Sequence, residues 1–410
     1  DGTTAFGNDH RFGNFGSAAG AWIVSEEPWM KAVEKVINFA KLRASYGTSG
    51  GDQIGSYQYL NTFGIRNPYA GSIGLAPARI ANPDLHWESK RSEELGLTLQ
   101  FLQGRIEFDG SYYRAWTKDP LLSKALSSVT GFFNVVTNTP DAQLLTWGYE
   151  ATLNTINIKT GNFKWTTAFN ISIPKSKLVS FPGLADGNSI NPGFPNYRLG
   201  KPVTGMMLIK YAGVNPQTGH YNFINAQGVT VDYDGTNLNS VTDRTVFVDL
   251  APKYYGGLGN TFSYKNLSAG FFFTFTKRMA PTMDSYQILP AGQFNVNPLV
   301  SALRRWQKPG DITDQPRPSQ DIAGFFSQGA YHNSTGAYTS STYARLNNVN
   351  INYDFTGNWL AKAGIRKLGF YLQGQNLLTI SKYKDLDPEN LNPFSLGPLR
   401  VFVAGFNITL

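Results

Sequence analysis

The sequence contains no cysteine, and this absence excludes several kinds of chemistry. With 0 Cys in 410 residues, disulfides, thiolate metal sites and cysteine nucleophiles are excluded. Charged residues are few, at 16% against about 25% in an average soluble domain. No run of about 18 apolar residues occurs, which excludes a membrane-spanning helix. The N-terminus also lacks a basic segment followed by an apolar core, the pattern of a signal peptide.

The residues that are abundant suit strands and turns. The sequence contains 28 Phe, 21 Tyr and 42 Gly, and aromatic residues favour strands. The mean hydropathy of -0.27 is compatible with a membrane barrel, because barrel strands are apolar only at alternate positions and barrel loops are polar. The net charge of +8 does not indicate nucleic-acid binding, because the basic residues are scattered and the cluster of Lys362, Arg366 and Lys367 is small.

The last stretch, residues 399–410, shows the alternation of a strand with one apolar face. That face carries Phe402, Ala404, Phe406, Ile408 and Leu410. Similar patterns occur in about thirteen segments, which are 14–25, 39–48, 88–101, 105–117, 144–158, 163–173, 203–212, 220–224, 254–264, 267–277, 342–355, 368–378 and 399–410. One short helix is expected, at 26–38.

The connections between these segments alternate between short and long. The short ones lie near 102–104, 159–162, 214–219, 265–266 and 355–367, with a moderate one at 26–38. The long ones lie at 49–87, 118–142, 174–202, 225–252, 278–341 and 379–398. Short periplasmic turns and long external loops are typical of an outer-membrane barrel. If the last strand runs inward, every long loop lies outside and the C-terminus is periplasmic.

Several segments resemble the SusC/RagA-type family of TonB-dependent outer-membrane transporters of Bacteroidota. The resemblance lies in DGTTAFGNDHRFGNFGSAAGAWIVSEEPWM, AKLRASYGTSG, NPDLHWESKRSEELGLTLQFLQGRIEFDGSYYRAWTKDPLL, YARLNNVNINYDF and FYLQGQNLLTISKYKDLDPE. These segments follow the family's order and cover essentially the whole chain.

The resemblance implies an all-β fold, a transmembrane antiparallel barrel of 22 strands. Residues 1–410 would form its C-terminal portion, with about the last thirteen strands. An odd count also predicts part of a larger barrel, because single-chain bacterial barrels have even numbers. The plug domain, the TonB-contacting segment and the signal peptide would precede this chain. The implied protein sits in the Gram-negative outer membrane and imports oligosaccharides or peptides with TonB and a SusD-like surface lipoprotein, without a cofactor.

We expect no catalytic and no metal site. Glu93 and Glu94 are adjacent on a strand and therefore point to opposite faces, and Asp385 and Asp387 lie in a loop that resembles the family's. The four histidines, His10, His86, His220 and His332, are far apart in the sequence and include no closely spaced ligand pair. The segment before Asp243 departs from the family's acidic loop, which argues against an ion site there.

The sequence offers one candidate ligand site and one set of lipid-facing residues. Arg304, Arg305 and Trp306, in the longest loop, could stack on a sugar ring or pair with an acidic ligand; the alternative is that they only support the loop. The residues expected to face lipid are Phe271, Phe273, Phe275, Phe402, Phe406, Ile408 and Leu410.

Two other protein classes remain open on the sequence. A barrel of this kind could be a scaffold or surface-assembly component that transports nothing. A soluble adhesive β-protein would be recovered without detergent, whereas an outer-membrane barrel would not.

Overall fold

The computed structural model describes residues 1–65, 71–184, 194–233, 236–239, 241–287, 289–294, 297–384 and 386–410. The chain divides into two compact units. The first comprises Asp1–Leu153 and Ser172–Val203, and the second comprises Asn154–Ile171 and Thr204–Leu410. Each unit is described by itself.

The main element is an antiparallel sheet of eleven strands in the order β1-β2-β5-β6-β9-β10-β16-β17-β20-β21-β22. Eleven of the roughly thirteen strand segments expected from the sequence correspond to these strands. The other two, 203–212 and 220–224, form small separate sheets, β11-β15 and β12-β13-β14. The strands of these two sheets have only three to five residues, whereas a membrane-crossing strand needs about 9–11. When these two segments are no longer counted as barrel strands, the connections between the remaining strands still alternate between short and long.

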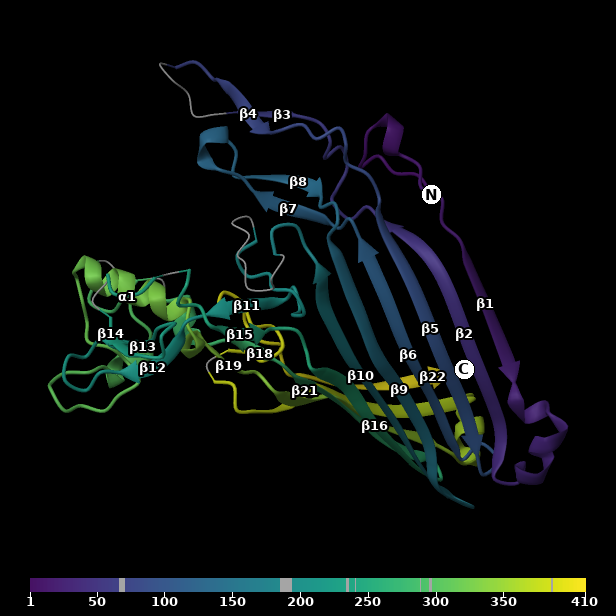
Figure 1. Cartoon of the computed structure of the whole chain (residues 1–410). Coiled ribbons are helices and arrows are strands. Elements are labelled where there is room, and N and C mark those ends of the chain that lie inside the picture. The colour runs from purple at the N-terminus through teal and green to yellow at the C-terminus, as the bar shows by residue number, and fades with distance from the viewer. Residues whose placement is uncertain are drawn as a thin grey trace. The chain divides into compact units, whose positions relative to one another are not determined.

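The sheet strands of unit 1 are β1 (Ser17–Ile23), β2 (Ile37–Gly51), β5 (Glu88–Phe101) and β6 (Ile106–Lys118), and β9 (Gln143–Thr160) and β10 (Phe163–Ser180) run through both units. Its other elements are η1 (Asn8–His10), η2 (Val24–Glu26), η3 (Pro28–Val33), β3 (Thr62–Ile65), β4 (Leu75–Arg79), β7 (Leu121–Ala125), η4 (Ser128–Thr130) and β8 (Asn134–Asn138). Figure 1 shows the β3-β4 and β7-β8 hairpins beyond one end of β5 and β6, and the purple coil of η3 at the opposite end.

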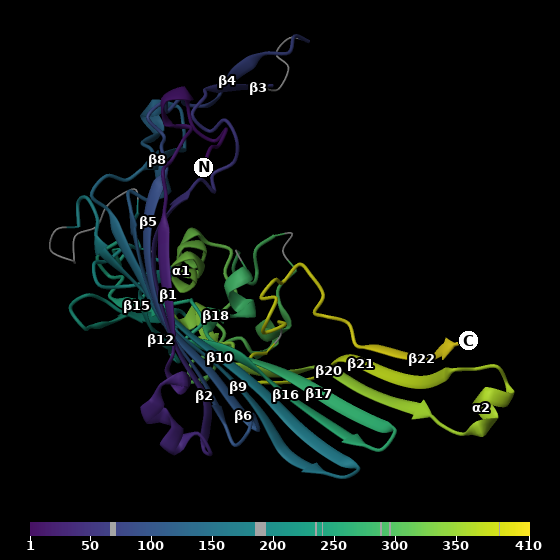
Figure 2. The ribbon, with the colours of Figure 1, turned by 90° about the vertical axis from the view of Figure 1, so that its right-hand side faces the viewer.

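The sheet strands of unit 2 are β16 (Tyr254–Tyr264), β17 (Leu267–Lys277), β20 (Tyr343–Phe355), β21 (Lys367–Ser381) and β22 (Val401–Thr409). Its other elements are β11 (Gly205–Leu208), β12 (Lys210–Val214), β13 (Tyr221–Ile224), β14 (Thr230–Asp232), β15 (Val246–Asp249), β18 (Met279–Pro281), η5 (Met283–Tyr286), η6 (Val300–Arg304), α1 (Ile322–His332), η7 (Thr335–Ala337), β19 (Tyr338–Ser340) and α2 (Asn358–Lys362). Figure 2 shows α2 and α1 at opposite ends of β20 and β21.

The structure corrects the helix expected at 26–38, where it has a shorter 3₁₀ helix. Pro28 begins the 3₁₀ helix η3, which ends at Val33, and the chain enters β2 at Ile37. The longer helix, α1, was not expected, because Gly324 and Gly329 lower the helix propensity of its sequence. It begins at an N-cap in which the Asp321 side chain accepts a hydrogen bond from the Gly324 N–H.

The buried hydrophobic clusters lie mostly in the connections between the sheet strands. One, in unit 2, gathers Ile209, Tyr221, Phe223, Tyr233, Tyr331 and Ala337. Two in unit 1 centre on Leu178 with Phe181 and on Phe6 with Leu85. The long connections therefore carry cores of their own. No helix in the described ranges is both long enough and apolar enough to cross a membrane.

Candidate functional site

In unit 2 the strand register places the predicted lipid-facing residues on one face of the sheet. Directly paired residues of antiparallel strands share a face, so each row of partners can be followed across the strands. One row is Phe271, Val349, Gly374 and Phe402, and another is Leu267, Tyr353, Phe370 and Phe406. Ile408 is paired with Leu368, and the ring of Phe271 contacts that of Phe273 at 5.8 Å between centroids. Alternation adds Phe275 to the face, and Leu410 follows the last strand.

This apolar face is exposed on β22 and half-buried on β17, where Phe271, Phe273 and Phe275 lie. Phe402 is 76% exposed and Phe406 62%. Unit 1 repeats the arrangement: Leu42 is paired with Leu97 and Ala44 with Leu95, and Leu95 is 61% exposed. These residues border a shallow groove of ≈ 830 Å³ whose lining also includes Trp22, Phe108, Tyr112, Tyr149 and Ala151. Exposed apolar faces of this extent mark contact with lipid or with a protein partner.

The opposite face of the sheet is polar, and in unit 1 it carries an ion pair. Arg43 Nη1 donates to Asp109 Oδ2 at 2.7 Å and to Thr98 Oγ1 at 2.5 Å, and Arg43 Nη2 donates to Asp109 Oδ1 at 3.0 Å. Arg43 is the cross-strand partner of Gly96, where a Cβ atom would lie 2.7 Å from Nη2. Because Gly96 has no side chain, the guanidinium has room to reach Asp109. Asp109 lies on β6, two residues from Ser111, the cross-strand partner of Gly96.

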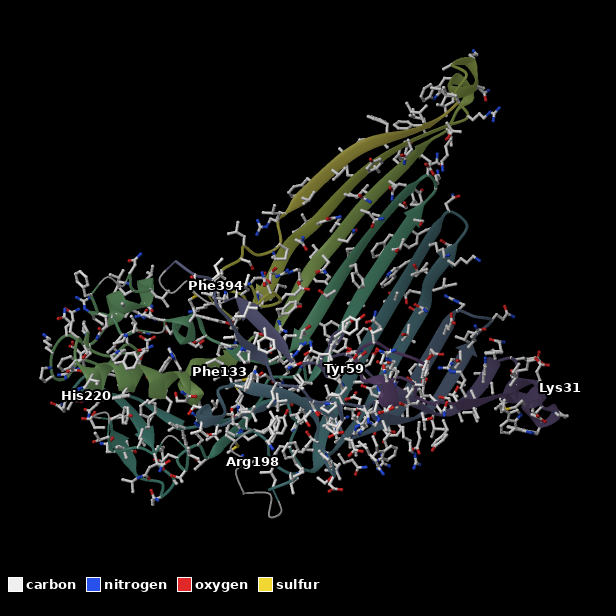
Figure 3. The ribbon with its side chains drawn as sticks, turned by 90° about the horizontal axis from the view of Figure 1, so that it is seen from above. Lys31, Tyr59, Phe133, Arg198, His220 and Phe394 are labelled. Carbon is white, nitrogen blue, oxygen red and sulfur yellow. The ribbon has the colours of Figure 1, made fainter. Side chains whose placement is uncertain are left out.

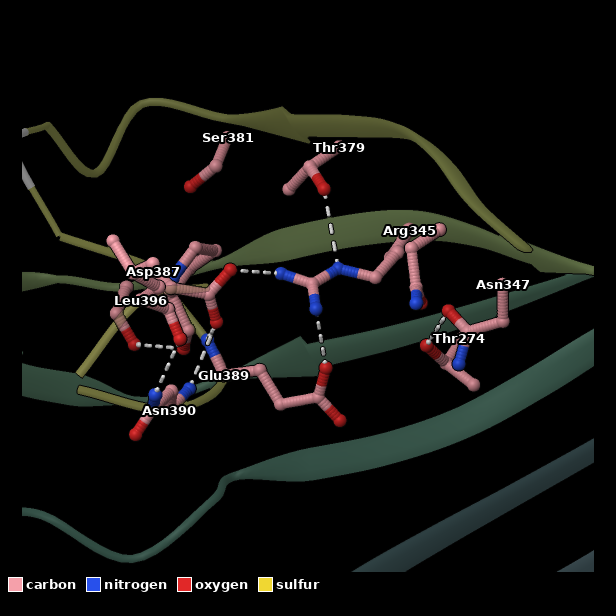
Figure 4. Close-up of polar contacts among 12 residues, drawn as sticks. Thr274, Arg345, Asn347, Thr379, Ser381, Asp387, Glu389, Asn390 and Leu396 are labelled. Atoms are coloured by element: carbon pink, nitrogen blue, oxygen red, sulfur yellow. Dashed lines mark hydrogen bonds and ion pairs between the residues drawn. The ribbon is translucent and has the colours of Figure 1, made fainter. Parts of the chain in front are cut away.

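In unit 2 the opposite face carries amides and a buried arginine, together with the apolar side chains of Phe272, Val401 and Val403. Asn348 is paired with Gln375, and Asn350 with Gln373. Further along β20, Arg345 is 2% exposed. Its Nε donates to Thr379 Oγ1 at 3.1 Å and its Nη1 to Glu389 Oε2 at 2.8 Å, while Nη2 donates to Asp387. Figure 4 shows the guanidinium between these three partners.

The loop segment that holds Asp387 and Glu389 is fixed by further contacts. Asp387 Oδ1 accepts hydrogen bonds from the backbone N–H groups of Glu389 at 3.0 Å and Asn390 at 2.9 Å. Arg278 Nη2 donates to the Pro388 carbonyl oxygen at 2.9 Å and to that of Glu389 at 2.6 Å. Two arginines from β20 and from the end of β17 thus hold the β21–β22 connection against the sheet.

In unit 2, parts of the β10–β16 connection from Thr204 onwards and of the β17–β20 connection form a folded lobe around stacked aromatic rings. Tyr221 and Tyr331 stack at 4.7 Å between centroids with an interplanar angle of 14°, and Tyr211 meets Tyr331 edge-on at 5.5 Å. Burial raises the pKa of Tyr331 to about 12. Burial also raises the pKa of Tyr211 and Tyr221 above the usual phenol range. These phenols are therefore neutral and serve the core of the lobe.

His332, the last residue of α1, belongs to the same lobe. Its Nε2 lies 2.9 Å from the Gln287 carbonyl oxygen, so the tautomer that carries a proton on Nε2 can donate there. Burial lowers the pKa of His332 below its usual value, and the bond to Gln287 opposes part of that effect. His332 is therefore held mainly in its neutral form.

The structure places the predicted ligand residues at the end of η6, and two of the three serve the loop. Trp306 Nε1 donates to the Pro216 carbonyl oxygen at 2.8 Å, and a Cβ atom at Gly219 would lie 2.6 Å from the indole ring. Arg304 Nη2 forms an exposed ion pair with Asp314 Oδ2 at 2.9 Å. Arg305 borders a small polar cavity together with Asp284, Gln287 and Gln315. Figure 3 labels His220 among the segments of this lobe.

The residues considered for other chemistry are placed as follows. Register puts Glu93 opposite Arg114 and Glu94 opposite Tyr113, on different faces. Asp385 lies outside the described residues. Both carboxylate oxygens of Asp243 accept backbone N–H groups, from Ala226 and Asn239. His10 and His86, distant in sequence, have ring centroids 5.8 Å apart, but within the described part of the chain no three potential ligand side chains come together.

Sequence reasoning missed the arginine-centred clusters. Period-two alternation assigns Arg43 and Arg345 to the polar faces of their strands. Their partners, 66 and 44 residues away respectively, depend on strand register and loop course, for which the sequence carries no local signal.

The comparisons with known proteins agree with the fold. No protein-family model matches the chain. TonB-dependent receptor P3 of Formosa agariphila is 28% identical over 408 residues, which is 95% of this chain and 39% of that receptor. TonB-dependent receptor SusC of Bacteroides thetaiotaomicron is 27% identical over 431 residues, which is 97% of this chain and 40% of SusC.

Among solved structures, the RagAB peptide transporter matches with a TM-score of 0.81 over 99% of this chain and 44% of the matched chain. At 22% identity this likeness shows the fold alone. The relatives are receptors and transporters rather than enzymes, as the sequence predicts. The chain is therefore homologous to the TonB-dependent receptors of the SusC type, as its motifs predict, and spans about two fifths of the length of the curated relatives it matches.

Proposed function

We propose that this chain supplies part of the barrel wall and the outer loops of a TonB-dependent importer in the outer membrane. The observation that supports the proposal best is the sheet with two unlike faces. In each unit one face of the sheet is apolar and includes exposed residues, such as Leu95 in unit 1 and Phe406 in unit 2, and the other face carries ion pairs or amides. In water the apolar face would cost about 25 cal/mol for each Å² of exposed apolar surface, whereas lipid removes that cost.

The orientation follows from the connections. The long connections, which carry folded cores, would lie outside the cell, and the short connections and the C-terminus would lie in the periplasm. Phe271, Phe273, Phe275, Phe402, Phe406, Ile408 and Leu410 would contact lipid. Asn350, Gln373 and the Arg43–Asp109 pair would line the lumen.

The cargo in this proposal is an oligosaccharide or a peptide. Amides and paired charges such as Asn350, Gln373 and Asp109 can exchange hydrogen bonds with hydroxyl or peptide groups, and one structural neighbour is named a peptide transporter. Of the three predicted ligand residues, Arg305 borders a polar cavity, which at ≈ 10 Å³ and with Asp284 in its lining accommodates a water molecule rather than an acidic ligand. Arg304 and Trp306 would act mainly by holding the loop.

The partners are part of the same proposal. A SusD-like surface lipoprotein would close over the folded lobe of unit 2, and its contacts would include the segments around α1. Contact with TonB, and the plug that TonB moves, would belong to the part of the relatives' length that this chain does not match.

The test is transport by the intact receptor in its own membrane. Cells that carry the receptor should accumulate a labelled oligosaccharide or peptide, and deletion of either TonB or the neighbouring lipoprotein should abolish uptake while the receptor stays in the outer-membrane fraction. Recovery of the receptor in the outer membrane with no TonB-dependent uptake of any such solute would favour the alternative, a surface scaffold. Recovery without detergent would contradict both.

A further inference from the structure

Three basic side chains stand on the apolar face of unit 1, at the end from which the long connections leave. Arg91 lies on β5, and Arg114 and Lys118 lie on β6. Alternation along β5 puts Arg91 on the face of Leu95 and Leu97, and Arg114 is the cross-strand partner of Glu93 on that same face. Basic residues on a lipid-facing surface require an explanation, because hydrocarbon does not tolerate them.

The length of β5 places these residues at the level of the lipid headgroups. A strand needs about 9–11 residues to cross the hydrocarbon, and β5 has 14. The apolar positions of its outward face run from Phe101, beside the short turn, to Leu95. Counted from Phe101, Arg91 is the eleventh residue, so it lies at the outer edge of the hydrocarbon. There an anionic headgroup is the natural partner.

Aromatic rings hold the two arginines of this basic group in place. The Arg91 guanidinium carbon lies 5.1 Å from the ring centroid of Tyr46 and 5.3 Å from that of Trp116. The Arg114 guanidinium carbon lies 4.0 Å from the centroid of Trp116. Cation–π contacts of this kind hold arginine planes in place, so the N–H groups along their edges remain available for an oxygen-rich ligand.

A hollow lies beside these rings, and the side chains around it carry an excess of positive charge. The hollow, of ≈ 410 Å³, is lined by Thr48, Ser89, Arg91, Trp116, Lys118 and Gln143. Glu93 accepts a hydrogen bond from Arg91 Nη2 at 2.8 Å, and it offsets one of the three positive charges. The remaining charge is complementary to a multiply charged anion, and arginine is well suited to phosphate.

We propose that Arg91, Arg114 and Lys118 bind the phosphate groups of a phosphorylated glycolipid in the outer leaflet. The acyl chains of that lipid lie along the groove bordered by Leu95, Leu97 and Tyr112. This inference rests on the proposed function, because it requires the long connections to lie on the outer side of the membrane.

The intact receptor, in detergent micelles, is titrated with three probes: diphosphorylated lipid A, lipid A stripped of its phosphates, and inorganic phosphate. Bound lipid is counted by native mass spectrometry. Each basic residue near a membrane surface contributes a factor of about five to anionic-lipid binding. The double variant Arg91→Ala/Arg114→Ala should therefore bind the diphosphorylated lipid about 20- to 30-fold more weakly than the unmodified receptor.

Two further variants separate charge from folding. Arg91→Lys/Arg114→Lys keeps the charge and should retain most of the affinity. Lys277→Ala removes a basic residue from the corresponding face of unit 2, where Lys277 Nζ lies 6.0 Å from the Tyr254 ring centroid, and should leave binding unchanged. Equal binding of the phosphate-free lipid, or inorganic phosphate binding as tightly as the lipid, would overturn the inference. A receptor that imports solute but shows either result would retain its proposed function.

Discussion

Arg345 on β20 donates from Nη1 to Glu389 Oε2 at 2.8 Å, and joins two positions that lie 44 residues apart. The same guanidinium pairs with Asp387, whose side chain is 14% exposed. Because Arg345 is almost completely buried, this ion pair should govern the order of the β21–β22 connection.

Replacement of Arg345 by alanine should therefore be strongly destabilising. Removal of one partner from a buried ion pair costs about 3–5 kcal/mol, and the cost here should be towards the lower end, because Glu389 is 48% exposed. Chymotrypsin should then cleave within residues 386–400, for example after Phe394, faster than it does in the unmodified receptor. Arg304→Ala is the matched control: its pair with Asp314 is 60% and 62% exposed, so it should cost less than about 1 kcal/mol. Equal effects of the two variants would contradict the assignment.

Gly256 should be irreplaceable even by alanine. A Cβ atom there would lie 2.1 Å from the Asn170 carbonyl oxygen, and a backbone atom within a ladder cannot move aside. Overpacking of this kind costs about 1–3 kcal/mol or more. Gly259→Ala on the same strand meets its nearest atom at 3.4 Å and should be tolerated. The folded fraction on unheated gels measures both, and normal folding of Gly256→Ala would show that β10 and β16 pair differently.

The lobe around α1 should lose stability in mild acid. Because burial lowers the pKa of His332, the unfolded lobe binds the proton more readily. Between that lowered pKa and the unfolded value of about 6.5, stability rises with pH, and it is constant above that range. Hydrogen exchange in α1 should therefore be faster, relative to the intrinsic rate, at pH 5 than at pH 7.5.

His332→Gln should remove this pH dependence, because the amide keeps a donor for Gln287 but does not titrate. The hydrogen bonds to Asp321 lower the pKa of that carboxyl from 3.8. The stability that Asp321 contributes to the lobe is therefore lost only well below the pH range of this experiment. A pH dependence that persists between pH 5 and 7.5 in His332→Gln would assign the effect to another group.

Adjacent residues of β22 should respond in opposite ways to a positive charge. Phe406 is paired with Phe370 on the apolar face, and Asn407 with Gly369 on the polar face. An arginine on the lipid face near the bilayer midplane costs about 2–4 kcal/mol. Phe406→Arg should therefore reduce the amount of folded receptor in the outer membrane, and Asn407→Arg should not. The reverse order would mean that the apolar face does not meet lipid.

The sequence predicts the long strands well, because alternation is a local property. The bounds 88–101, 254–264 and 267–277 coincide with β5, β16 and β17, and the resemblance of motifs to the SusC-type family is confirmed by the relatives. Short strands were misassigned: Tyr221 and Phe223 alternate like a barrel strand but belong to the core of the lobe. Long strands of the sheet and short strands of the lobe show the same local alternation, and only the length of the strand distinguishes them.

Contacts across the sheet could not be predicted. Arg43 meets Asp109 because β2 and β6 flank β5 in a particular register. His10 approaches His86 because the segment before β1 lies beside the β2–β5 connection in unit 1. The candidate ligand residues illustrate a further limit. Trp306 looked accessible in a polar loop, but its indole donates to Pro216 and covers Gly219, a role fixed by a turn 90 residues away.

The central claim, that the long connections face the exterior of the outer membrane, can be measured in intact cells, because the chain contains no native cysteine. Ser128→Cys lies in the long connection between β6 and β9, and Lys31→Cys lies in the moderate connection between β1 and β2, at the end of the sheet expected to face the periplasm. Both positions are exposed. A maleimide too large to cross the outer membrane should label Ser128→Cys in intact cells and Lys31→Cys only after lysis. Labelling of Lys31→Cys alone, or of both in intact cells, would contradict the account.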